Sequence, residues 1–442
     1  MTLPAAIDAT GARAERMRAA VAAHAAAMRG ALPSRPACDG LPPIDRILGG
    51  AWLETEHGPA FVRDEWFAPD HLHGTVALGA ALALPRPALE AILGRPLPDG
   101  PYGCPPTSDL RPPTSDLLSP PRLAFFDIET TGLSGGTGTY AFLAGLGSFE
   151  DGPSGEDGGF RLRQYFLPAV DGERAMLALL AADLARCDAL VTYNGRAFDV
   201  PVVETRMTLA RLQPACGAMP HLDLLHPVRR LYRHRLPSCR LADAERRLLR
   251  VERFDDVPGS LIPALYFDYV RAGRAAPLRA VFRHNAEDVL SLVGVLARLA
   301  RLLEGDPPDP EDAAAVARWW ELGGDEPRAL ALYRRALPWL AGSDDWRWAA
   351  HRHARLSRRT GAHDEAAALW SALWQQGDVA AGLALAKHLE HRARDHPAAE
   401  QVVAGLLTAS PDAARPELEA RLARIRRKQA RRTVQARPPR TG

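Results

Sequence analysis

The sequence predicts an α/β domain built on a mixed sheet, followed by an all-helical domain. Two observations carry this prediction. Apolar runs rich in β-forming residues cluster between residues 122 and 194, with one helical pattern among them. From residue 309 to about 410, helical patterns follow one another without a strand pattern. With 442 residues, 47% of them hydrophobic, the chain is long enough for two or three domains with separate cores.

The α/β domain is expected over residues 122–303. Its first strand, RLAFFDIET, is an apolar run between Pro121 and Gly132. Two further strands continue as an antiparallel meander, and a mixed region follows. This order of elements is typical of an RNase H-like fold. The expected elements are three strands, a helix, a strand and a long final helix, over 122–130, 139–149, 160–167, 172–186, 189–194 and 277–303.

Residues 1–100 form an N-terminal region to which the sequence assigns no role, with a helix expected over about 1–30 and another within 73–94. Residues 101–121 contain a direct repeat of PPTSDL. Proline cannot donate to a β ladder and stiffens the chain, so this stretch is expected to be a linker. A new domain should therefore start after residue 121.

The helical region over 309–410 resembles tetratricopeptide repeats. Trp319, Leu322 and Gly323 form the W-x-x-L-G pattern that opens such a repeat. Second helices are expected over 327–337, 364–373 and 397–406, near the ~34-residue period. A generic helical bundle is the alternative. Residues 411–442 form a basic tail, which is expected to be frayed over 421–440. Its basic residues either add affinity for nucleic acid or are solvated and disordered.

Composition excludes several classes of protein. The net charge of +2 points to no particular partner, and the five cysteines show no CxxC pair or zinc-ligand spacing. No stretch reaches the ~20 apolar residues of a membrane span, and the N-terminus is a poor signal peptide. We therefore expect a cytoplasmic protein without membrane contact.

The first candidate site residues are Asp127 and Glu129, two apart on the strand over 122–130. Side chains at i and i+2 share one face of a strand. Two carboxylates on one face repel each other unless they are exposed or neutralised. The apolar residues around them indicate burial, so a divalent cation is the expected neutraliser.

Two further segments carry acidic residues. In VTYNGRAFDVP, Asp199 opens a helix after a strand, where an aspartate alone would most simply cap the helix. In FRHNAEDVLSL, His284 and Asp288 are four apart on one helix face, where alone they would suit a surface ion pair.

Taken together, the three segments predict a metal site. Four carboxylates with hard oxygen ligands suit two divalent cations, Mg²⁺ or Mn²⁺. Two such cations stabilise the attacking and leaving oxygens when a phosphodiester is cleaved. His284 is a candidate general base, because imidazoles titrate near neutral pH.

The order D-x-E, N-G-x-x-F-D, H-x-x-x-D resembles the DEDD superfamily of 3′–5′ exonucleases, including the exonuclease domains of family B DNA polymerases. Over residues 122–303 the chain also resembles YprB-like bacterial proteins, and similar chains carry a C-terminal tetratricopeptide region. The resemblance implies that Asp127 bridges both cations, that Glu129 and Asp288 complete the nucleophile-side site, and that Asp199 serves the second cation.

The same resemblance implies substrate-binding roles for four residues: Thr130 and Leu133 at the terminal nucleotide, and Asn194 and Phe198 in the cleft that holds the strand. Superfamily members with a histidine usually place it five residues before the last aspartate. His284 stands four before Asp288, where other members place a tyrosine, so its orientation is open. Asp223 is a further carboxylate expected near the cleft, either as part of the site or as a structural hydrogen-bond acceptor.

The predicted function is a metal-dependent 3′–5′ exonuclease acting on single-stranded nucleic acid, with DNA and RNA both open as substrates. One alternative is a scaffold in which the fold only binds nucleic acid. Another is a structure-selective endonuclease. In each case the helical repeats are candidates for binding a protein partner.

Overall fold

The computed structural model describes residues 43–97, 122–132, 138–151, 158–233, 235–305, 310–409 and 415–435. The chain divides into two compact units between Gly305 and Asp306. The helix expected over residues 1–30 and the linker expected over 101–121 lie outside the described residues.

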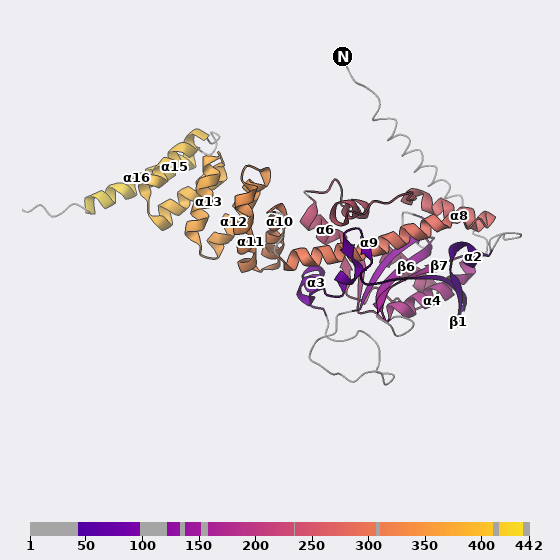
Figure 1. The fold of residues 1–442 in the computed structure, drawn as a ribbon. Helices are drawn as coiled ribbons and strands as arrows, with labels where there is room; N and C mark the ends of the chain where they lie inside the picture. The colour runs from indigo at the N-terminus through magenta and orange to yellow at the C-terminus, as the bar shows by residue number, and fades with distance from the viewer. Residues whose placement is uncertain are drawn as a thin grey trace, which may run out of the picture. The chain divides into compact units, whose positions relative to one another are not determined.

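The first unit is built on a mixed seven-stranded sheet (Figure 1). Its strand order is β1-β2-β7-β6-β5-β8-β9. Strand β5, next to the central strand β6, is antiparallel to β6 and parallel to β8, which in turn is parallel to β9. The strands are β1 (Ala51–Thr55), β2 (Gly58–Phe67), β5 (Leu123–Thr130), β6 (Ala141–Glu150), β7 (Gly159–Phe166), β8 (Ala189–Thr192) and β9 (His221–Asp223).

Strands β1 and β2, at one end of the sheet, correct the domain boundary expected from the sequence. β2 pairs antiparallel with β7, in a register that runs from Phe61 opposite Phe166 to Phe67 opposite Phe160. Residues 51–67 therefore extend the same sheet, and the start of the domain at residue 122 was placed too late. The ladder between β2 and β7 joins segments about 100 residues apart, which local patterns do not reveal.

Helices cover the sheet on both faces. Among their contacts, α4 touches β2 and β7, while α9 touches β5, β6 and β7. A small hairpin of β3 (Leu72–His73) and β4 (Val76–Ala77) also contacts α9. The helices of this unit are α2 (Ile44–Leu48), α3 (Arg86–Leu93), α4 (Glu173–Leu184), α5 (Asp199–Leu209), α6 (Leu225–Tyr232), α7 (Leu241–Ala244), α8 (Ile262–Ala272) and α9 (Leu278–Glu304).

Helix α9 lies unusually close to the sheet because β6 carries glycines beneath it. A Cβ atom on Gly145 would overlap the side chain of Asn285, and one on Gly147 would come within 2.8 Å of Val289. Gly145 pairs with Asp127 on the neighbouring strand. The glycines therefore let the middle of α9 approach the part of β5 that carries the acidic motif.

The second unit is all-helical, as expected. Taken in successive pairs, its helices have first members that begin at residues 310, 344 and 379, at intervals of 34 and 35 residues. The three expected second helices fall within α11, α13 and α15. The helices are α10 (Pro310–Gly323), α11 (Glu326–Leu340), α12 (Asp344–Arg359), α13 (His363–Gln375), α14 (Val379–His388), α15 (His396–Ala409) and α16 (Arg415–Gln435).

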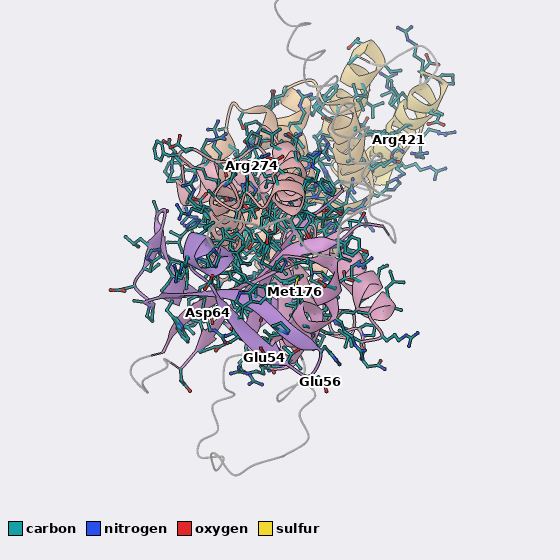
Figure 2. The ribbon with its side chains drawn as sticks, turned by 90° about the vertical axis from the view of Figure 1, so that its right-hand side faces the viewer. Glu54, Glu56, Asp64, Met176, Arg274 and Arg421 are labelled. Atoms are coloured by element: carbon teal, nitrogen blue, oxygen red, sulfur yellow. The ribbon has the colours of Figure 1, made fainter. Side chains whose placement is uncertain are left out.

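The basic tail is helical over 415–435, so the expectation that it is frayed was wrong there. Leu418 and Ile425 of α16 are buried in a cluster with α14 and α15 residues. The buried carboxylate of Glu390 accepts hydrogen bonds from Arg421 at 2.7 Å and from Lys428 at 2.8 Å (Arg421 is labelled in Figure 2). Apolar residues at helical spacing, Leu418, Leu422 and Ile425, together with the basic residues that bond Glu390, thus pack α16 against the preceding helices.

Among the described residues, no helix combines the length and apolar character that crossing a membrane requires.

Candidate active site

Strand β5 places Asp127 and Glu129 on one face of the sheet, where both are half-buried. Phe126 and Ile128 alternate with them and are buried in the main core cluster on the other face. The period of two in a strand therefore fixes where the carboxylates lie, because the apolar neighbours must be buried.

Asp199 reaches β5 from the turn after β8. That turn is held by Asp223, whose carboxylate accepts hydrogen bonds from the backbone N–H groups of Asn194 at 2.7 Å and Arg196 at 3.1 Å. Asp199 then begins α5, and its Oδ1 accepts from the N–H of Ile128 at 3.2 Å. This carboxylate thus links α5 to the strand between the two acidic residues of β5, which helix capping alone does not explain.

Helix α9 supplies the third segment. Asn285 is fully buried, and its Nδ2 donates to Asp127 Oδ2 at 3.0 Å. His284 Nε2 lies 3.6 Å from Asp288 Oδ2 and 3.9 Å from Glu129 Oε1. One ligand atom from each of Glu129, His284 and Asp288 lies within 4.8 Å of the others. The three sequence segments therefore converge on one place in the fold.

The electrostatics show that the carboxylates crowd each other. Burial raises the pKa of Asp127 well above its usual range, and the neighbouring carboxylates of Asp288, Asp199 and Glu129 raise it further. Burial, then Asp288 and Asp199, raise the pKa of Glu129 in the same way. Burial raises the pKa of Asp199 to about 7, against the opposing effect of its backbone hydrogen bonds. Such a cluster binds either protons or cations.

Arg253, which the sequence patterns did not single out, reaches this cluster from the segment between α7 and α8. Its guanidinium pairs with the carboxylates of Asp288 and Glu245, and its Nε lies 3.4 Å from Glu287 Oε2. Arg253 is thus a built-in counter-cation on the Asp288 side of the cluster. Asp127 and Asp199 show hydrogen bonds from Asn285 and Ile128 instead.

Asp256 is a second residue that the sequence did not indicate. Its Oδ1 lies 2.7 Å from His284 Nδ1. With Nδ1 held there, Nε2 is the ring nitrogen that faces Glu129 and Asp288. This contact gives the imidazole ring a defined orientation, while its role as a general base stays a prediction. No local pattern marks Asp256, because it lies 28 residues before its partner in an irregular segment.

Comparison with known proteins agrees with this geometry. Residues 124–300 match the model of the RNase H superfamily. The chain is also 33% identical over 321 residues to the uncharacterized protein YprB of Bacillus subtilis (strain 168), which covers 70% of this chain and 75% of that protein.

This chain belongs to the YprB family. Its α/β unit is an RNase H-like domain, which confirms the expected fold class and indicates a nuclease acting on nucleic acid. RNase H-like domains typically use divalent metal ions, and the acidic and histidine cluster of this YprB homologue has the ligand types such ions require.

The donor set of the cluster fits hard divalent cations. Asp127, Glu129, Asp199 and Asp288 offer only carboxylate oxygens, the ligands that Mg²⁺ and Mn²⁺ prefer. Burying several carboxylates together is costly unless a cation neutralises them. Arg253 pairs with Asp288 and lowers the pKa of Glu129, but burial and the neighbouring carboxylates still hold the pKa values of Asp127 and Glu129 well above their usual range.

The residues to which the resemblance assigns substrate binding differ in their exposure and hydrogen bonding. Thr130 is buried, and its Oγ1 donates to Gly132 O at 2.8 Å, so its hydroxyl is engaged in the turn after β5. Asn194 is exposed with a φ of 67°, and Phe198 is half-buried. Leu133 lies outside the described residues. Of the two roles expected for Asp223, the hydrogen bonds of its carboxylate correspond to that of a structural hydrogen-bond acceptor.

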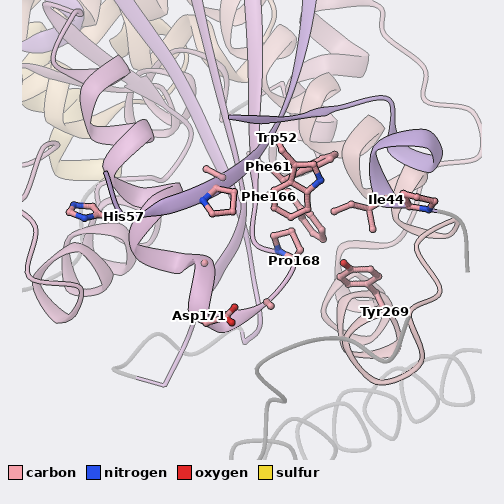
Figure 3. A pocket seen from close by; sticks show the side chains of 13 residues that line it. Ile44, Trp52, His57, Phe61, Phe166, Pro168, Asp171 and Tyr269 are labelled. Carbon is pink, nitrogen blue, oxygen red and sulfur yellow. The ribbon is translucent and has the colours of Figure 1, made fainter. Parts of the chain in front are cut away.

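A separate apolar pocket of about 560 Å³ lies between α2, the β1–β2 hairpin and α8 (Figure 3). Trp52, Phe61, Phe166 and Tyr269 contribute aromatic walls. No carboxylate of the cluster lines this pocket, so the acidic site and the apolar pocket are distinct features of the unit.

Proposed function

We propose that this chain is a 3′–5′ exonuclease that hydrolyses the phosphodiester bonds of single-stranded nucleic acid with two divalent cations, Mg²⁺ or Mn²⁺. The observation that carries the proposal is the convergence of β5, the start of α5 and the middle of α9. Hydrogen bonds from Ile128 to Asp199 and from Asn285 to Asp127 tie these three segments together.

Asp127, Glu129, Asp199 and Asp288 would hold the cations. When bound, the cations supply charge stabilisation at the attacking and leaving oxygens of the phosphodiester. Asn285 orients the Asp127 carboxylate, and the Ile128 N–H orients Asp199. Asp288 would exchange its pairing with Arg253 for this role.

His284 acts as the general base. Its Nε2 accepts the proton of the attacking water, while Asp256 at Nδ1 stabilises the imidazolium that forms. The water oxygen forms a new bond to phosphorus, and the bond between phosphorus and O3′ of the preceding nucleotide breaks. The products are a nucleoside 5′-monophosphate and a strand one nucleotide shorter.

A substrate panel tests this proposal. The full chain is incubated with Mn²⁺ and 5′-labelled single-stranded DNA, duplex DNA and RNA, each with a free or a blocked 3′ end. We expect shortening from free 3′ ends only. Cleavage of a circular single strand would replace the exonuclease by an endonuclease, since an exonuclease needs an end. Tight binding without metal-dependent turnover would favour a scaffold.

We infer further that the second unit is a tetratricopeptide array that binds a protein partner. Its helix-pair intervals of 34 and 35 residues support this assignment. Helix α16 would serve as the polar capping helix that repeat arrays require.

A further inference from the structure

The segment Arg253–Asp256 is fastened to helix α9 at three of its four residues. Arg253 pairs with Asp288, and the carbonyl of Asp255 accepts a hydrogen bond from Arg283 at 2.7 Å. Asp256 contacts His284 at 2.7 Å. The backbone of Asp255 has a φ of 53°, in the left-handed region that aspartate adopts more readily than most non-glycine residues. The segment is therefore a fixed feature beside the acidic cluster.

Phe254 is the remaining residue, and it points outward. Its side chain is 79% exposed, more than any other large hydrophobic side chain among the described residues. The residues on either side of it contact the cluster or α9. An exposed phenyl ring whose chain neighbours are fastened beside a candidate active site differs from a scattered surface apolar residue.

A basic pocket adjoins the same segment. It has a volume of about 540 Å³, and four arginines line it together with two glutamates. Glu287 belongs to its lining and also contacts Arg253, while Arg283 belongs to its lining and also bonds Asp255. The arginine pocket is thus linked to the Phe254 segment through Glu287 and Arg283. It is defined by four residues, Arg46, Arg63, Arg279 and Arg283.

The geometry points to a binding site for single-stranded nucleic acid, in which Phe254 stacks on a base and the arginine pocket holds the backbone phosphates beyond it. This inference rests on the proposed function, since the strand is taken to end at the acidic cluster. Single-strand binding sites combine a positive groove for the backbone with aromatic rings that stack on bases of any sequence. The site would thus bind the strand 5′ of its terminal nucleotide without strong sequence preference.

The test measures binding separately from cleavage. Fluorescence anisotropy follows labelled oligo(dT) and oligo(U) with the full chain in an Asp127→Asn background. Phe254→Ala is expected to weaken binding about 5- to 150-fold, because stacking of this kind is sequence-tolerant and strong, and Phe254→Trp should restore it. Leu209→Ala, which removes another exposed apolar side chain, is the matched control and should bind normally.

Salt dependence tests the arginine pocket. The variant Arg46→Ala/Arg279→Ala should reduce the slope of log affinity against log salt by about 1.4, since each phosphate contact of a single strand contributes ~0.7. Phe254→Ala should leave the slope unchanged. Arg186→Ala, which removes an exposed arginine just after α4, is the control for the loss of an arginine outside the pocket.

Failure of this inference can be distinguished from failure of the proposed function. If the Asp127→Asn protein binds strands but Phe254→Ala and the double arginine variant bind equally well, the inference is overturned while the proposed function stands. If the Asp127→Asn protein binds no strand and the wild-type chain shows no metal-dependent cleavage, both are overturned. Melting curves confirm that each variant is folded.

Discussion

Nδ1 of His284 lies 2.7 Å from Oδ1 of Asp256, and this contact leaves Nε2 facing Glu129 and Asp288. A histidine held by a carboxylate at one ring nitrogen presents the other in a defined orientation. The pairing holds Nε2 of His284 toward Glu129 and Asp288, which supports the proposed role of His284 as the general base.

Asp256→Asn should therefore lower kcat by about 10- to 100-fold, as expected for the loss of a residue that orients a site group. His284→Ala should cost more, about 10²- to 10⁴-fold. Because Asp256 acts through His284, the double variant should be no slower than His284→Ala. Steady-state kinetics on a single-stranded oligonucleotide measure all three, and additive losses would contradict the pairing.

Arg253→Met is expected to destabilise the metal-free protein by about 3–5 kcal/mol, because Asp288 and Glu245 lose their buried cationic partner. Added Mn²⁺ should then raise the melting temperature more in this variant than in the wild type, since the cation replaces the guanidinium. Thermal melts with EDTA and with Mn²⁺ make the comparison. An equal response of both proteins to Mn²⁺ would show that Arg253 and the cation do not share Asp288.

The stability of the metal-free protein should fall as pH rises through about 7. The folded pKa of Asp199 is raised to about 7 from an ordinary value of 3.8, so the folded state binds this proton more tightly than the unfolded state. Its contribution is fully present below about 3.8 and is lost as pH rises through about 7. Mg²⁺ should restore the stability, because it neutralises the ionised carboxylates.

Two buried histidines change the stability with pH in the opposite direction. The effect of Asp199 must therefore be measured as a difference in stability between two proteins. The pKa values of His73 and His221 are lowered to about 4 by burial, and their contribution is lost as pH falls below the ordinary value of 6.5. Both groups are present in Asp199→Asn. The stability of wild type minus that of the variant, from urea unfolding between pH 5 and 8, should decrease with pH. A constant difference would contradict the raised pKa.

Gly145→Ala tests the close approach of α9 to the sheet. The added methyl group would overlap Asn285 and displace the residue that orients Asp127. We expect a loss of about 1–3 kcal/mol in stability together with reduced activity. Gly172→Ala is the control, since nothing lies within 4 Å of its Cβ position. Unfolding curves and activity assays on both variants decide the matter, and a Gly145→Ala protein with unchanged activity would argue against this role of α9.

The sequence predicted the elements whose signals are local. The apolar runs of β5, β6, β7 and β8 and the helical pattern of α9 each lie within a short stretch of chain. The pairing of β2 with β7 was missed, because about 100 residues separate the strands. The fold of α16 was missed because its basic residues suggested a solvated tail, whereas Glu390 provides a buried partner for them.

The residues of the candidate site also divide into those that a local motif marks and those that only the fold brings together. Asp127, Glu129, Asp199 and Asp288 lie in motifs that can be read directly, and their roles as ligands remain a prediction. Arg253 and Asp256 lie in an irregular segment without a motif, and only the folded chain brings them to His284 and Asp288. Asn285 lay within a quoted motif but on a helix face whose contact with β5 depends on the glycines of β6.

The central claim is that the acidic cluster hydrolyses nucleic acid with divalent cations. The most direct measurement is the rate at which the full chain shortens a 5′-labelled single strand, with Mn²⁺ and with EDTA, for wild type, Asp127→Asn and the control Asp268→Asn, whose half-buried carboxylate pairs with Arg274 outside the cluster. We predict metal-dependent shortening by wild type and Asp268→Asn, and none by Asp127→Asn. Equal rates for wild type and Asp127→Asn, or no metal-stimulated cleavage of DNA or RNA by the wild type, would contradict the account.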